Sequence, residues 1–388
     1  MKRICFVQMM LLTLAPTLAW SGESLSVQHS IVAIEKDRFH GWPANNGVWQ
    51  WGNEILVAFT QGDFELHRGH NIAGRQDTLL SRSKDGGETW EMFDPEGFLD
   101  DDNEKFKAEG KKALTEPMDF NNPGFALRIF ATGYHGNDDP EGGFFYSYDR
   151  GQTWNGPYSL NGLNDHPEIK GKKLSPRTDY VIQDGKHCRV FISAEDPEIE
   201  LARLACIETT DGGRTFDFVS WITPEAEDYR AIMCQTVQVS DDHFVTAYRK
   251  IYQGGNKLAT IEAYESKDGC KTWDLLGTVK TMKTHSNPPA LLKLEDGRLC
   301  CAYGDRHVGE IRARYSEDNG KTWGPEVIIR DDFQPMDEDP DVDEPGRKYV
   351  DLGYPRMLQS PDGKLVVLYY WATEEHPQQF IGASIWKP

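Results

Sequence analysis

Short runs of alternating or continuous apolar residues, each broken by a tight turn, recur along most of the chain. Alternation with a period of two is typical of β-strands, and Gly, Asn and Asp at the breaks are typical of hairpin turns. The six predicted hairpins span Gly47–Thr60, Gly124–Gly133, Tyr180–Ala194, Thr236–Arg249, Ala290–Tyr303 and Met357–Trp371. The pattern therefore predicts an all-β protein built from repeated hairpins.

A second motif, Ser/Thr-x-Asp-x-Gly-x-Thr-Trp, follows each of the first five hairpins, with Phe216 and Cys270 as single departures. Its Asp and Ser/Thr side chains can bond nearby backbone N–H groups, and Gly permits positive φ, so each copy is interpreted as a structural turn. The motif aspartates are 64, 62, 57 and 50 residues apart, at Asp85, Asp149, Asp211, Asp268 and Asp318. This period is too long for helical solenoids and is typical of four-stranded propeller blades.

Six hairpins predict six blades, with the early strand at residues 26–34 joining the last blade. Seven blades is the alternative, because residues 91–121 and 324–350 could hold a further hairpin. The repeated turn resembles the Asp box of the sialidase (neuraminidase) superfamily. This resemblance implies a single sialidase-type β-propeller over residues 24–388, with its five Asp boxes on the outside, away from the active site.

The N-terminus reads as a secretory signal peptide over residues 1–19, since Lys2 and Arg3 precede an apolar run and Ala19 offers a small residue for cleavage. We therefore expect a secreted or periplasmic protein. Removing Lys2 and Arg3 changes the formal net charge from −20 to −20 − 2 = −22. Such a charge disfavours nucleic acid and anionic membranes as partners. We also expect a monomer.

Cysteine and histidine spacings do not indicate a metal centre. Six cysteines follow the signal, and a chain of this size can bury a sufficient core without disulfides, so buried thiols are favoured over a single Cys188–Cys206 bridge. The pair His67-x-x-His70 has metal-like spacing but no third ligand, so we interpret it as a solvated pair. No metal and no cofactor are expected.

Strand order predicts where functional side chains gather. In a propeller blade the innermost strand begins at one end of the central channel, here called the mouth, where the loop after the second strand also lies. Arg binds carboxylates bidentately, and Tyr and His can act as nucleophile, acid or base. The candidate catalytic residues are His40, His135, Tyr180 and Tyr354. The candidate substrate-binding residues are Asn45, Asn122, Arg177, Gln235, Arg249, His285, Arg306 and Arg356.

Further resemblances narrow the chemistry. The segment Gly353-Tyr354-Pro355 is similar to the one that carries the sialidase tyrosine nucleophile, but His40-Gly-Trp-Pro43 stands where sialidases have Arg-Ile-Pro. Four segments resemble propeller ulvan lyases and rhamnosyl-glucuronidases, namely 40–45, 122–128, 133–135 and 177–180. This resemblance implies lyase-type roles for His135, Tyr180 and Arg177, and a glucuronidase-type role for His40.

These features together predict an exported carbohydrate-active enzyme that cleaves a glycosidic bond at an acidic sugar of an oligo- or polysaccharide. Hydrolysis is favoured, because Tyr354 and His40 match hydrolase-like segments. The alternatives are a polysaccharide lyase of the ulvan-lyase type, an exo-sialidase, and a carbohydrate-binding propeller without catalysis.

Overall fold

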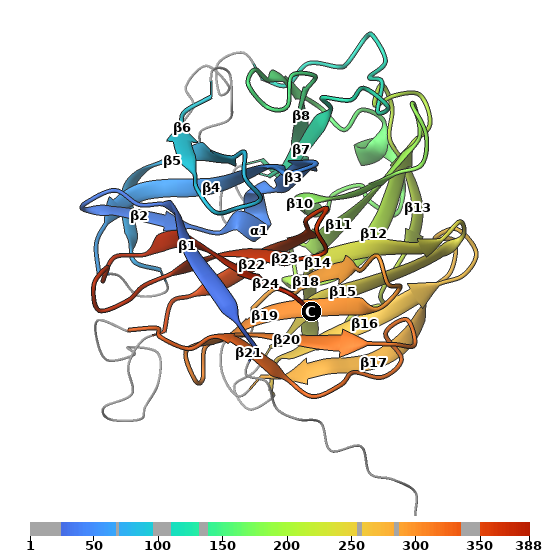
Figure 1. Cartoon of the computed structure of the whole chain (residues 1–388). Coiled ribbons are helices and arrows are strands. Elements are labelled where there is room, and N and C mark those ends of the chain that lie inside the picture. The colour runs from blue at the N-terminus through green and yellow to red at the C-terminus, as the bar shows by residue number, and fades with distance from the viewer. Residues whose placement is uncertain are drawn as a thin grey trace, which may run out of the picture.

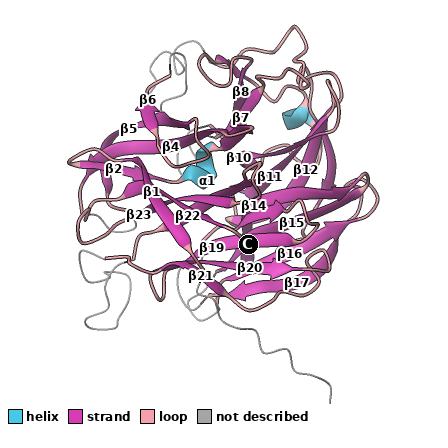
Figure 2. Cartoon of the chain, in the orientation of Figure 1, coloured by secondary structure: helices cyan, strands magenta, loops and turns pink. Residues whose placement is uncertain are grey.

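A computed structural model of the chain describes residues 25–66, 70–95, 110–131, 139–253, 258–282, 287–334 and 350–388. The predicted signal peptide, His135 and His285 lie outside these ranges. Strands dominate the described residues, and helical structure is confined to two short segments, α1 (Pro43–Asn46) and a 3-10 turn at Leu163–Asp165 (Figure 2). The predicted all-β class is therefore confirmed. Within the described residues, no helix is long and apolar enough to cross a membrane.

The strands form antiparallel sheets that follow one another along the chain (Figure 1). The first sheet contains β2 (Arg38–Gly41), β3 (Val48–Trp51), β4 (Glu54–Phe64), β5 (Ile72–Ser83) and β6 (Glu91–Phe93). The second contains β7 (Ala126–Phe130), β8 (Gly143–Ser147) and β9 (Asn155–Tyr158).

The largest sheet consists of two four-stranded units joined by one parallel pair, Ala202 with Arg230. Its first unit is β10 (Lys173–Ile182), β11 (Cys188–Asp196), β12 (Leu201–Thr209) and β13 (Asp217–Trp221). Its second unit is β14 (Tyr229–Ser240), β15 (His243–Tyr252), β16 (Thr260–Ser266) and β17 (Asp274–Thr281).

Two further four-stranded sheets complete the described structure. One contains β18 (Ala290–Lys293), β19 (Leu299–Asp305), β20 (Glu310–Ser316) and β21 (Val327–Arg330). The other contains β22 (Gly353–Gln359), β23 (Leu365–Trp371), β24 (Phe380–Trp386) and, at its outer edge, β1 (Val27–Ala33). The pairing of β1 with β24 confirms that the early strand joins the last sheet.

One strand of each sheet, and two of the largest sheet, surround a common centre, as a β-propeller requires. Contacts link β7 to β10, β10 to β14, β14 to β18, β18 to β22 and β22 to β3, and the Trp49 indole on β3 donates to the Leu127 carbonyl on β7. Helix α1 lies at this centre, because it contacts β4, β7, β10 and β22 (Figure 1). The number of blades in the whole chain stays a prediction, since residues 96–109 and 335–349 are not among those described.

The core lies between neighbouring sheets, and β23 shows why. All seven residues of β23 are buried, and the strand alternation sends them to opposite sides. Val366, Leu368 and Tyr370 pack in the cluster that contains Phe59 of β4. The other four residues pack in the cluster that contains residues of β19 and β20; they are Leu365, Val367, Tyr369 and Trp371. Each such buried aliphatic side chain contributes about 1.5–3 kcal/mol relative to exposure.

The five Asp-box turns have the predicted hydrogen bonds. In the first, Ser83 Oγ donates to Asp85 Oδ1 at 2.8 Å and accepts the Gly87 N–H at 2.8 Å, while the Thr89 N–H donates to Asp85 Oδ1 at 2.9 Å. Each box precedes the outermost strand of its sheet. The boxes are therefore structural turns at the end of the blades opposite the mouth, where Gly86 N–H donates to the Asn53 carbonyl of the β3–β4 turn.

The cysteines in the described ranges are buried free thiols. The alternative of a Cys188–Cys206 bridge is wrong because of strand register: Cys188 pairs with Thr209, and Cys206 pairs with Phe191. The two cysteines are thus three positions apart along adjacent strands, too far for the Cα separation that a disulfide needs.

Candidate functional site

Three inner strands share an irregularity at the mouth. The pairing register shifts in β10, β14 and β22, and the residues Thr178, Met233 and Tyr354 within these shifts have φ of 53°, 55° and 50°. A non-glycine residue in this left-handed region costs on the order of 1–3 kcal/mol and is held in place by its surroundings. The bulges take Tyr354 out of the regular alternation of β22.

Tyr354 is 6% exposed and is held from both ends. Its backbone N–H donates to Asn287 Oδ1 at 2.8 Å, and Arg249 Nη1 donates to its hydroxyl oxygen at 3.2 Å. The Arg306 guanidinium lies 5.8 Å from the ring centroid, within cation–π range. Tyr354 is therefore a phenol of fixed orientation between two arginines.

A buried carboxylate lies beside this tyrosine. Asp351 is fully buried, and its Oδ1 accepts hydrogen bonds from Tyr370 Oη at 2.5 Å, His70 Nδ1 at 2.9 Å and Arg306 Nη2 at 3.1 Å. Burial opposes ionisation, but His70 and Arg306 hold the pKa of Asp351 below its usual value. Its Oδ2 has no hydrogen-bond partner among the described residues.

Aromatic rings connect these polar groups. The His70 ring packs edge-on against Trp42 at 4.9 Å and against Tyr354 at 6.2 Å, and Tyr354 packs against Tyr370 at 6.0 Å. We call the resulting set the Tyr354 cluster; its members are Trp42, His70, Arg249, Arg306, Asp351, Tyr354 and Tyr370. Four different sheets supply them. The described members of the cluster thus include two guanidinium groups and one carboxylate.

The structure brings Arg249, Arg306 and Tyr354 together, as the sequence predicted. His40 lies apart from them, because β2 alternates: Phe39 faces Trp42 and Tyr370, while His40 faces Phe59 and Gln61. The His40 side chain is 0% exposed, and burial lowers its pKa to about 4. Its predicted catalytic role stays a prediction, without a described contact to the Tyr354 cluster.

Tyr180 and Arg356 occupy packed positions. Tyr180 packs against the cluster that contains Leu127 and Val190, and burial raises the pKa of its hydroxyl. Arg356 is 3% exposed and donates Nη2 to the Ala44 carbonyl at 2.7 Å and to the Arg177 carbonyl. Arg356 therefore ties α1 to β10 at the centre of the ring, and its predicted role in substrate binding stays a prediction.

Asn45 and Gln235 each have a buried side-chain oxygen that could bind a ligand. The Asn45 Oδ1 and Gln235 Oε1 atoms are buried without a hydrogen-bond partner among the described residues. Buried polar atoms normally find a partner, so these two are candidates for contacts with a bound molecule or water.

The placement of Asn122 at the mouth is wrong. The Phe120 N–H donates to the Gly185 carbonyl in the β10–β11 turn, and the Gly124 carbonyl accepts from Arg150 in an Asp box. Asn122 therefore lies at the Asp-box end. The reason is that the β7–β9 sheet begins with a strand that runs toward the mouth, and residues 110–125 add no strand before it.

The interpretation of His70 as a solvated residue is also wrong, because Asp351 binds it. His70, Asp351 and Tyr370 are the site residues that sequence reasoning missed. Asp351 and Tyr354 are close in sequence, which was a usable signal. In the run Tyr369-Tyr370-Trp371, however, only the strand alternation decides that Tyr370 faces Asp351 while Tyr369 faces Ser384.

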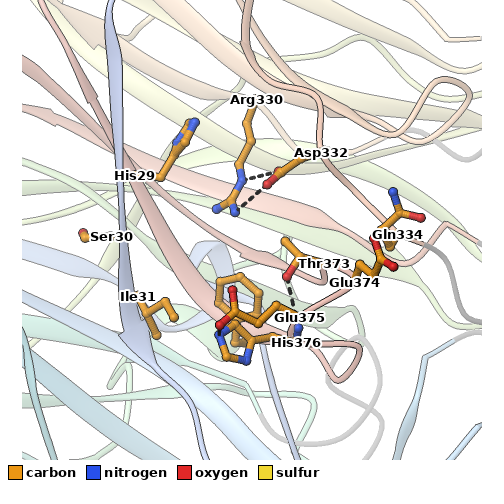
Figure 3. Close-up of a pocket in the computed structure, with 11 residues that line it drawn as sticks. His29, Ser30, Ile31, Arg330, Asp332, Gln334, Thr373, Glu374, Glu375 and His376 are labelled. Atoms are coloured by element: carbon orange, nitrogen blue, oxygen red, sulfur yellow. Dashed lines mark hydrogen bonds and ion pairs between the residues drawn. The ribbon is translucent and has the colours of Figure 1, made fainter.

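A cavity of about 430 Å³ lies between β1, the end of β21 and the β23–β24 loop (Figure 3). Arg330 is the only arginine or lysine among its described lining residues, and it forms an ion pair with Asp332 at 2.6 Å. Glu374 and Glu375 add negative charge. Carboxylates outnumber cations among its described lining residues, so this cavity does not favour an acidic ligand.

Comparison with solved structures identifies the fold. A Dyadobacter fermentans protein of unknown function superposes with a TM-score of 0.66 at 19% identity, covering 93% of this chain and 99% of that protein. The Hadza microbial sialidase has a TM-score of 0.57 at 14% identity, covering 90% and 66%. The Penicillium chrysogenum α-L-arabinanase complexed with arabinobiose has a TM-score of 0.55 at 14% identity, covering 90% and 96%. At these identities the likeness shows the fold, a sialidase-type β-propeller.

Sequence comparison gives the family. No curated protein sequence matches the chain. The likeness to ulvan lyases and rhamnosyl-glucuronidases stays a prediction. Residues 68–367, which include all five Asp boxes, match the BNR repeat-like domain, and the chain therefore belongs to the BNR repeat-like domain family.

Proposed function

We propose that this protein is an exported glycoside hydrolase that cleaves a glycosidic bond at an acidic sugar, with the Tyr354 cluster as its active site. The observation that carries the proposal is the Tyr354 hydroxyl, held by Arg249 at 3.2 Å, in a cluster with two arginines and one carboxylate. Two arginines beside one tyrosine, in a chain of net charge −20, favour a carboxylate-bearing sugar, because guanidinium groups bind carboxylates in bidentate fashion.

In this proposal Tyr354 is the nucleophile. Its oxygen attacks the anomeric carbon, the leaving sugar departs, and water then releases the bound sugar. Arg249 and Arg306 bind the sugar carboxylate and orient it toward the tyrosine. Structural neighbours that include a sialidase and an arabinanase support a carbohydrate-active enzyme on this fold. The predicted signal peptide supports export, to the periplasm or outside the cell.

The test is a panel of acidic glycans, namely ulvan, gum arabic and sialylated oligosaccharides, incubated with the purified protein. Reducing ends and the ultraviolet absorbance of unsaturated uronates are followed separately. New reducing ends without absorbance are the expected result. Both signals together would identify a lyase, and binding without either signal would identify a carbohydrate-binding propeller.

Tyr354→Phe tests the assigned nucleophile, with Tyr146→Phe as the matched control. Tyr146 is also a tyrosine packed between aromatic rings, but it is half-buried and packs in the cluster that contains Leu127 and Phe144, away from the mouth. We expect Tyr354→Phe to lower kcat/KM by about two orders of magnitude or more, because the phenol oxygen forms the covalent bond. Equal rates in the two variants would refute the role of Tyr354.

A further inference from the structure

His70 is positioned as a proton-transfer group. It lies in the β4–β5 loop at the mouth, and its side chain is 26% exposed, whereas its partner Asp351 is 0% exposed. Nδ1 lies 2.9 Å from Asp351 Oδ1, and the ring packs edge-on against both Trp42 and Tyr354. The imidazole is therefore fixed in orientation on one side and accessible on the other.

The hydrogen bond to Asp351 sets the tautomer of the ring. An ionised carboxylate only accepts hydrogen bonds, so Nδ1 carries a proton, and in the neutral ring the lone pair is on Nε2. The carboxylate is itself fixed by Tyr370 at 2.5 Å and by Arg306 at 3.1 Å. A histidine held by a buried carboxylate in this way can accept a proton at Nε2 and return it.

We propose that His70 is the acid–base residue of this site and that Asp351 is its positioning residue. The inference rests on the proposed function, because the proton it moves belongs to the glycosidic bond. His70 Nε2 takes the Tyr354 hydroxyl proton as the tyrosine oxygen bonds to the anomeric carbon. The same proton passes to the leaving oxygen as the glycosidic C–O bond breaks.

The second half of the reaction returns the site to its starting state. Water attacks the anomeric carbon and gives a proton to His70 Nε2, while the bond from carbon to the Tyr354 oxygen breaks. His70 then returns that proton to the tyrosine oxygen. One proton moves in each half, and no other reactant is needed.

His70→Gln and His70→Ala separate this role from a structural one. Gln can donate a hydrogen bond to Asp351 and fill the same space, but it cannot accept and return a proton at neutral pH. His187→Gln is the matched control: His187 Nε2 lies 2.9 Å from Glu208 Oε2 with a side chain 25% exposed, and it follows the β10–β11 turn at the Asp-box end. Thermal unfolding of each variant verifies that it is folded.

The assay compares the glycan that the wild type cleaves with the 2,4-dinitrophenyl glycoside of the same sugar, whose leaving group needs no proton. We expect both His70 variants to lose on the order of 10²–10⁴-fold in kcat on the glycan and less in the first turnover of the dinitrophenyl glycoside, which needs no proton at its leaving oxygen but still needs a base at Tyr354. Added imidazole should restore part of the activity of His70→Ala. Asp351→Asn should lower kcat with little change in KM.

Three results would overturn the inference. Activity of His70→Gln on the glycan equal to that of His187→Gln would show that no proton passes through His70. Equal losses on both substrates would show that no proton passes from His70 to the leaving oxygen. If the wild type cleaves no acidic glycan, the proposed function itself fails and this inference with it, so the two failures are distinguishable.

Discussion

Replacing Arg306 by Met tests the buried ion pair on which the Tyr354 cluster depends. Arg306 is 9% exposed and donates to the Leu352 carbonyl at 3.1 Å, to Asp351 at 3.1 Å and to Tyr370 Oη at 2.5 Å. Met keeps much of the packing against the Tyr354 ring but removes the charge. The fully buried Asp351 then keeps His70 and Tyr370 as donors and loses its permanent cation.

The expected cost follows from these contacts. Removing one partner of a buried ion pair costs about 3–5 kcal/mol, because the other charge stays buried without compensation. Two donors to Asp351 remain, so we expect the lower end, a loss of about 3 kcal/mol in the free energy of unfolding. Asp351→Asn should reduce the penalty of Arg306→Met, giving a coupling energy of at least about 1 kcal/mol in a double-mutant cycle.

Urea denaturation of the wild type, both single variants and the double variant measures these quantities. Lys364→Met is the control, since Lys364 and Asp362 form an exposed ion pair at 2.8 Å and its removal should leave stability unchanged. An Arg306→Met variant as stable as this control, or strictly additive single changes, would refute the reasoning.

Two further predictions concern stability and pH. Asp85→Ala should lower stability by about 1–2 kcal/mol after solvent screening, because the Asp-box turn loses several hydrogen bonds, while kcat stays at the wild-type value; a changed kcat would contradict the structural role. Burial alone would raise the pKa of Asp85, but hydrogen bonds from Thr89 and Ser83 lower it to about 2. The stabilisation that the Asp85 carboxylate gives the folded state is therefore present above pH 4 and is lost as the pH falls toward 2. Burial lowers the pKa of His40 from 6.5 to about 4, so between these pH values the histidine is protonated in the unfolded chain and neutral in the folded one. As the pH falls from 6.5 to 4, the free energy of unfolding should therefore decrease by up to about 1.4 kcal/mol per pH unit. Urea midpoints across this range should show a smaller slope in His40→Gln, and an unchanged slope would contradict the assignment.

The sequence alone determined the features that depend on short stretches of chain. The Asp boxes are recognisable because Ser83, Asp85, Gly87 and Thr89 complete their hydrogen bonds within one turn. Five of the six hairpins were predictable for the same reason, since the period of two and the turn residues are local. The prediction for Gly124–Gly133 is wrong, because its described residues hold the single strand β7, which pairs with β8. The family and the all-β class followed from the repetition of these units.

Only the tertiary structure decided the composition of the candidate site. His70 and Asp351 are 281 residues apart, and no local pattern links a loop histidine to an aspartate on another sheet. Strand alternation directs the His40 side chain away from Tyr354, and it directs the Tyr370 side chain toward Asp351. A shift of one residue in either strand would have reversed that outcome. The sequence-based prediction placed Asn122 at the mouth because the strand that follows it, β7, was expected to start there. In the structure β7 starts at the Asp-box end. The physical reason is that turns are specified by neighbouring residues, whereas an active site is specified by the register and direction of strands that meet only in the folded ring.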